Sequence, residues 1–168
     1  MSIVGLRNQF DLILGGGNLV HCPSKGPCKP ATQHTLKFAN GIARGKDDLI
    51  YVPFSAEPFI GVYQSDEFGT LKEVHRIPTG MGADNLSVDS NGDIWVAGIP
   101  KVLELMGTLD DPLNGLATST ILKIHKSGEG RYQVEKMLED GEKKVLSSAT
   151  TAVFDVRTKR LFIGGKFN

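Results

Sequence analysis

The sequence has no excess of charge of either sign, because its 19 lysines and arginines balance its 19 aspartates and glutamates. It also lacks the basic block that nucleic-acid binders usually carry. No stretch approaches the ~20 apolar residues of a membrane-spanning helix, and Met1 to Gly17 lacks the basic start and clean apolar run of a signal peptide. We therefore expect no nucleic-acid partner and no membrane span in this chain, which leaves small-molecule ligands open.

Cysteine is also scarce, with two residues in the segment "HCPSKGPC". Cys22 and Cys28 flank a Pro/Gly turn, where they are placed to pair across a hairpin in an oxidising compartment. The alternative is a zinc site with the neighbouring His21 and His34, although the Cys-x-x-Cys spacing typical of structural zinc motifs is missing. A turn or a disulfide is the favoured interpretation.

Long amphipathic helical patterns are absent as well, and the sequence instead repeats a strand–turn–strand plan three times. The copies are "NGIARGKDDLIYV", "DNLSVDSNGDIWV" and "TTAVFDVRTKRLFIG". Aligning the aromatic residue of each second strand places Asn40, Asp84 and Thr150 at equivalent positions, with one extra turn residue in the third copy. These residues are predicted to begin equivalent strands.

Further strand-like runs follow the first two copies, namely "FIGVYQ" with "LKEVHRIP" and "STILKIHK" with "YQVEKMLED". Four antiparallel strands per unit are typical of a propeller blade. The segment "KVLELMGTLDDPLNGLAT" is predicted as a loop or short helix, and outer strands are expected near "NLVHCPS" and "HTLKFA". The chain is therefore predicted to be all-β, with about three propeller blades over residues 18–168, whereas closed propellers have about four to eight blades. We expect it to be part of a larger protein, and residues 1–17 are not placed.

Several motifs, taken together, resemble the C-terminal half of the serum paraoxonase/arylesterase family, in particular its fungal members. They are "FANGI" at 38–42, "DNLSVDSNGDIWVAG" at 84–98, "DDP" at 110–112 and "SSATTAVFDVRTKRLFIGG" at 147–165. The likeness runs from about residue 18 to the end. The resemblance implies a six-bladed β-propeller with a calcium ion in its central tunnel, acting on a small-molecule ester or lactone substrate.

The same resemblance implies calcium ligands. In the family, the asparagine of the "ANG" motif and both residues of the "DN" pair bind calcium, which carries over to Asn40, Asp84 and Asn85. Calcium takes about six to eight oxygen ligands, and carboxylate and amide oxygens suit it. Adjacent strand residues point to opposite faces, so Asp84 and Asn85 can share an ion only if the backbone is irregular there. The alternative is a pair of Asx turns, and the agreement of repeat position, chemistry and motif favours the metal.

The resemblance also assigns Phe38 to the substrate pocket, although a plain core aromatic is an equal alternative. The oxygen-rich segments "DSNGD" and "GKDD" lack the spacing of an EF-hand and are predicted as hairpin turns. No catalytic residue is assigned, because the family's proposed histidine pair belongs to its N-terminal half. The histidines present, at positions 21, 34, 75 and 125, are expected to be ordinary surface residues.

Two functional classes are compatible with this sequence. The first is a calcium-dependent hydrolase of the paraoxonase, arylesterase or lactonase kind, inactive alone because few ligands and no general base are present. The second is a non-catalytic calcium-stabilised propeller, or a strictosidine-synthase-like or gluconolactonase-like relative, because a fold does not fix a function.

Overall fold

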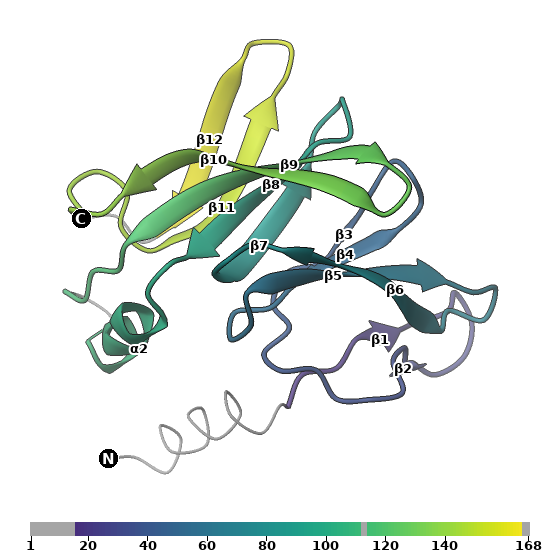
Figure 1. The fold of residues 1–168 in the computed structure, drawn as a ribbon. Coiled ribbons are helices and arrows are strands. Elements are labelled where there is room, and N and C mark those ends of the chain that lie inside the picture. The colour runs from purple at the N-terminus through teal and green to yellow at the C-terminus, as the bar shows by residue number, and fades with distance from the viewer. Residues whose placement is uncertain (1–15, 112–113, 166–168) are drawn as a thin grey trace.

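The computed structural model describes residues 16–111 and 114–165, in which strands of antiparallel sheets predominate (Figure 1). At the N-terminal end of this part, β1 (Val20–His21) pairs with β2 (Lys29–Pro30). The first four-stranded sheet contains β3 (Ala43–Arg44), β4 (Ile50–Pro53), β5 (Phe59–Ser65) and β6 (Leu71–Pro78). The second contains β7 (Gly82–Val88), β8 (Ile94–Ile99), β9 (Ser119–Gly128) and β10 (Arg131–Asp140). A hairpin of β11 (Ala149–Asp155) and β12 (Arg160–Gly165) follows.

The strand order within both four-stranded sheets follows the order along the chain. This confirms the predicted all-β class, and β5, β6, β9 and β10 lie where the alternating runs place them. The helix α2 (Val102–Asp110) lies in the segment predicted as a loop or short helix. Among the helices of the described residues, none combines the length and apolar character that a membrane crossing requires.

One predicted strand, "HTLKFA" at 34–39, is wrong. The structure gives this segment two isolated bridges, in which Leu36 pairs with Gly17 and Ala39 pairs with Phe54. Between them Phe38 has a φ of 51°, in the left-handed region. Extended backbone cannot continue through that conformation, so the alternating pattern of the sequence does not produce a strand here.

The cysteines and the acidic turns follow the favoured interpretations. Cys22 and Cys28 are joined by a disulfide across the β1–β2 hairpin, which excludes these sulfurs as zinc ligands. The "DSNGD" segment is a hairpin turn, in which the amide of Gly92 donates to the carbonyl of Asp89 at 3.0 Å. The "GKDD" segment closes the β3–β4 connection in the same way, with the amide of Asp48 donating to Gly45.

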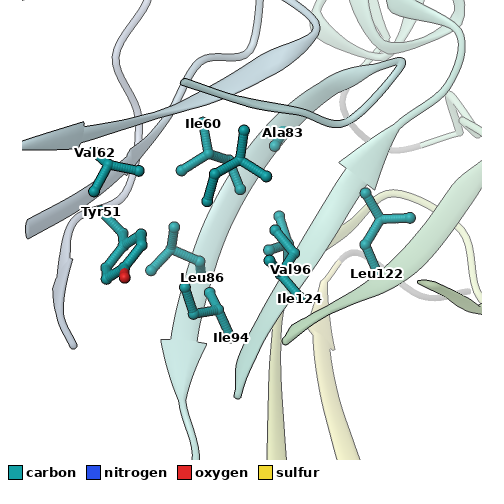
Figure 2. Packing of buried hydrophobic residues seen from close by; sticks show 10 residues of the cluster. Tyr51, Ile60, Val62, Ala83, Leu86, Ile94, Val96, Leu122 and Ile124 are labelled. Carbon is teal, nitrogen blue, oxygen red and sulfur yellow. The ribbon is translucent and has the colours of Figure 1, made fainter. Parts of the chain in front are cut away.

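The strand β8 supplies side chains to two cores, because successive residues of a strand point to opposite faces. Ile94 and Val96 lie in the core between the two four-stranded sheets, which Figure 2 shows. Trp95 and Ala97 lie in the core between the second sheet and the β11–β12 hairpin. All residues of β8 are buried, so this strand lies at the centre of a stack of sheets.

The first strands of the three repeats are neighbours in space. β7 contacts β3 and β4 on one side and β11 on the other. The positions that the repeat alignment makes equivalent are therefore brought together at the start of these strands.

Candidate functional site

Each first strand of a repeat carries one extra residue at the equivalent place. In β7, Asp84 and Asn85 lie between the pairs Ala83–Gly98 and Leu86–Val96, where the partner strand has a single residue. In β11, Thr150 is the additional residue between two successive pairs. In the first repeat, residues 40–42 face two residues of the partner, between the Ala39–Phe54 bridge and the Ala43–Tyr51 pair. A β-bulge re-aims side chains, so the irregular backbone that a shared ion requires at 84 and 85 is present.

The bulges of β7 and β11 are joined by the side chain of Asn85. Its Nδ2 donates to Oδ1 of Asp84 and to the backbone carbonyl of Thr150, both at 2.9 Å. The Thr150 carbonyl only accepts, and the Asp84 carboxylate only accepts when it is ionised, so the amide must present its nitrogen to them. The Oδ1 of Asn85 therefore points away from these partners.

The bulge of the first repeat is joined to β7 by Ser55. Nδ2 of Asn40 donates to the Ser55 Oγ, and this hydroxyl donates to the carbonyl of Ala83, each at 3.0 Å. Ser55 is buried, with 2% of its surface exposed. Asn40 is thus tied to the residue that directly precedes Asp84.

Glycine allows the two bulges to approach closely. A Cβ on Gly41 would lie 2.9 Å from both the Cα and the Oδ1 of Asn85. A Cβ on Gly82 would lie 2.1 Å from the carbonyl oxygen of Ser55. Gly80 has a φ of 73°, a conformation that glycine adopts without a steric penalty, and Gly82 is required for close packing. The structure therefore brings Asn40, Asp84 and Asn85 into one neighbourhood.

Among the described residues of this neighbourhood, only Asp84 carries a carboxylate. Burial raises the pKa of its carboxyl to about 6, and burial is the single cause of the shift. Buried charges are normally paired with an opposite charge or bound to a metal. Asp84 accepts an amide hydrogen bond but has no cationic partner among the described side chains. A bound cation would therefore offset the desolvation cost of the charged carboxylate.

The side-chain oxygens of Asn40, Asp84 and Asn85 are chemically suited to bind a hard cation. Asn40 and Asn85 both commit their amide nitrogens to the protein, and no hydrogen bond from the described residues reaches either amide oxygen. Amide and carboxylate oxygens are ligands that calcium accepts. The set is small, however, because no group of three or more histidine, cysteine, aspartate or glutamate side chains gathers anywhere in the described part of the chain.

Phe38 lies two residues before Asn40 and shares its attachment to Ser55. Its carbonyl accepts a hydrogen bond from the Ser55 amide at 3.1 Å. Its left-handed φ of 51° is an outlier for a bulky residue, and such strain gathers at functional sites. Ser148, two residues before Thr150, has the same φ, so this backbone conformation belongs to two of the repeats.

The histidines lie away from this neighbourhood. His75 stacks on Tyr132, with ring centroids 5.3 Å apart. His125 contacts Asp93 through Nδ1 at 2.7 Å. His21 belongs to β1 and His34 to the bend after β2. Thus no histidine of the described residues is in place to act as a base beside Asp84.

Sequence reasoning missed Ser55. It is the one polar residue that ends the apolar run "LIYVPFS", which follows the "GKDD" turn. A polar residue at the buried end of a strand is a signal for a hydrogen-bonding role. Thr150 was aligned with Asn40 and Asp84 but not assigned a part, and its backbone carbonyl holds the Asn85 amide.

Comparison with known families supports the resemblance. A family model described as Arylesterase matches residues 28–168, which is most of the chain and includes all three repeats. A search of curated proteins finds no match. The match covers every residue of the bulge neighbourhood described above, and the chain belongs to the arylesterase family.

Proposed function

We propose that Asn40, Asp84 and Asn85 bind a calcium ion that serves the hydrolysis of a small-molecule ester or lactone. The observation that carries this proposal is the pair of amide oxygens without a hydrogen bond from the described residues, beside a half-buried carboxylate without a cationic partner among them. The Asp84 carboxylate and the Oδ1 atoms of both asparagines would hold the ion. When bound, calcium supplies a Lewis acid that stabilises the negative charge developing on the substrate oxygen.

Phe38 is proposed to line the substrate side of this site. The support is its place two residues before Asn40 and its strained backbone, which the Ser55 amide fixes. Arylesterase membership agrees with a small-molecule ester as the ligand.

We propose further that residues 18–168 form about three blades of a six-bladed propeller. Two four-stranded meanders and a hairpin that repeats their first two strands support this arrangement, as do the equivalent bulges in β7 and β11. Calcium needs about six to eight ligands, so its remaining ligands and a general base would come from residues beyond those described.

A second candidate is a calcium-stabilised propeller without catalysis. The specific observation in its favour is that the described histidines all lie away from Asp84. General acid–base assistance is worth about 10²–10⁴-fold in rate, and its absence would leave a binding site alone.

The test is an esterase assay with phenyl acetate and a simple lactone, in millimolar calcium or in chelator. We expect the 168-residue chain to give no turnover above buffer. A chain extended at its N-terminus by the further blades is expected to give calcium-dependent turnover that Asp84→Ala removes. Asp66→Ala, in an exposed turn, is the matched control.

Calcium-dependent turnover by the 168-residue chain would show that its base lies within this chain. Calcium-independent turnover by the extended chain, unchanged in Asp84→Ala, would remove the proposed chemistry. Calcium binding by the extended chain without turnover would support the second candidate.

A further inference from the structure

We propose that Ser55 is a positioning residue of this site, whose hydroxyl fixes the Asn40 carboxamide so that its oxygen faces the ion. The inference rests on the proposed function and adds a residue that touches neither ion nor substrate. Ser55 directly follows the Ala39–Phe54 bridge at the end of β4 and is 2% exposed. Its hydroxyl forms hydrogen bonds with the Asn40 side chain and the Ala83 carbonyl.

The direction of the two hydrogen bonds decides the orientation of Asn40. A serine hydroxyl has one proton, and the Ser55 proton is committed to the Ala83 carbonyl, which cannot donate. The lone pairs of Oγ remain to face Asn40, so Asn40 must present a donor there. A flipped amide would place Oδ1 against a second oxygen with no proton between them, so the two oxygens would repel and the hydrogen bond to the buried Ser55 hydroxyl would be lost.

Asn85 is oriented independently of Ser55. Its nitrogen faces Oδ1 of Asp84 and the carbonyl of Thr150, neither of which carries a proton when Asp84 is ionised. Removing the Ser55 hydroxyl therefore frees one of the two amides and leaves the other in place. Of the two amide side chains, the geometry assigns Ser55 an effect on the orientation of Asn40 alone.

The same hydrogen bonds also distinguish positioning from a catalytic role. A serine nucleophile needs a base to take its proton, and the Ser55 proton is held by a backbone carbonyl. The backbone of Ser55 makes a separate tether, because its amide donates to the Phe38 carbonyl at 3.1 Å. That tether survives in Ser55→Ala, so the variant removes the orienting hydroxyl while keeping the segments attached.

The first measurement is an NMR spectrum of the ¹⁵N-labelled 168-residue chain without calcium. The side-chain NH₂ of Asn40 is expected to give a dispersed pair of signals, since one proton is bonded to Ser55. In Ser55→Ala this pair should collapse to solvent-exposed values. Ser147→Ala is the matched control, because Ser147 is also buried and its hydrogen bonds lead to Ala117 and Ser148.

The second measurement is the calcium affinity from the same spectra. Removing a partner that orients a metal ligand typically weakens metal binding about 10–100-fold, and we expect Ser55→Ala to lose about 10-fold, near the lower end, because one ligand of several is affected. Ser147→Ala should bind as the wild type does.

A third comparison separates orientation from a general loss of structure. Asn40→Asp presents an oxygen in either orientation, so calcium binding by this variant should no longer depend on Ser55. We expect Asn40→Asp and the double variant Asn40→Asp with Ser55→Ala to have equal affinities. A merely structural Ser55 would instead lower the affinity in both backgrounds.

The outcomes divide cleanly. Equal calcium affinities of wild type and Ser55→Ala would overturn the inference while leaving the proposed function standing, and so would a loss that persists in the Asn40→Asp background. If the wild type binds no calcium, the proposed function fails at that step. An Asn40 signal that ignores Ser55→Ala would then overturn the positioning role on its own.

Discussion

At the scale of single residues, the site depends on side chains whose hydrogen-bonding capacity leaves them one orientation. The amide nitrogens of Asn40 and Asn85 donate hydrogen bonds to protein acceptors, and no hydrogen bond from the described residues reaches either amide oxygen. Asp84 accepts one of the hydrogen bonds from Asn85, and burial raises the pKa of its carboxyl to about 6. Gly41 completes the arrangement because its missing side chain lets the first repeat lie against Asn85.

The Gly41→Ala variant is expected to be less stable than the wild type. Its Cβ would lie 2.9 Å from the Asn85 Cα, a backbone atom that cannot move away alone. Overpacking of this kind costs about 1–3 kcal/mol of unfolding free energy, measurable by urea denaturation in chelator.

Gly107→Ala is the matched control for that variant. A Cβ on Gly107 meets no atom within 4 Å, and the residue lies inside α2. Alanine is favoured over glycine in a helix by about 0.5–1 kcal/mol, so this variant should be slightly more stable. A Gly41→Ala protein as stable as the wild type would contradict the close contact between the first two bulges.

The sequence predicts which residues form the candidate site, but it does not predict how their side chains are oriented. Repeat alignment and the family motifs select Asn40, Asp84 and Asn85. The proton direction of Ser55 depends on the Ala83 carbonyl, 28 residues away in the chain. Such a contact exists only once the strands have packed, and no local pattern encodes it.

At the scale of elements, alternation predicts strands well and their irregularities poorly. The segments of β5, β6, β9 and β10 are recognisable because apolar residues recur at every second position. The bulges at Asp84 and Thr150 appear only as register shifts between paired strands. The failed strand at 34–39 has the same origin, because the conformation of Phe38 is imposed by its contact with Ser55 rather than by its own preference.

The helix α2 is attached through Glu104 to Thr118, the residue directly before β9. The Glu104 Oε2 accepts hydrogen bonds from the amide and the hydroxyl of Thr118, at 3.0 and 2.8 Å. These bonds, the amide bond first, lower the pKa of the Glu104 carboxyl to about 2. A carboxyl with a lowered pKa stabilises the folded state above its unfolded value near 4.5, and this contribution is lost as pH falls towards 2.

We therefore expect Glu104→Ala to expose the Thr118 amide. Its protection factor against hydrogen exchange at neutral pH should fall about tenfold or more, since a bond to a charged acceptor is lost. Lowering the pH of the wild type from 5 to about 2.5 should reduce the protection in the same direction. Lys101→Ala, which removes only an exposed ion pair with Glu104, should leave it unchanged. Undiminished protection in Glu104→Ala would show that α2 is attached by other contacts.

At the scale of the whole molecule, sheets are stacked so that two hydrophobic cores lie between neighbouring repeats. The core of Figure 2 joins the two four-stranded sheets, and a polar link at its edge runs from Asp47 to Lys126 at 2.5 Å. The number of sheets follows from the repeats in the sequence. Their mutual placement does not, because it depends on long-range packing of side chains such as Trp95 against Phe154.

We propose that the three bulges meet at a calcium site, and the most direct test of this proposal is a calcium titration of the ¹⁵N-labelled chain. Calcium would be raised to about 10 mM, above the millimolar range of weak protein sites. We predict signal shifts confined to Asn40, Gly41, Asp84, Asn85 and Thr150, which Asp84→Asn removes. Shifts at the acidic turn of Asp89 to Asp93 that survive Asp84→Asn, or no shifts at all, would contradict it.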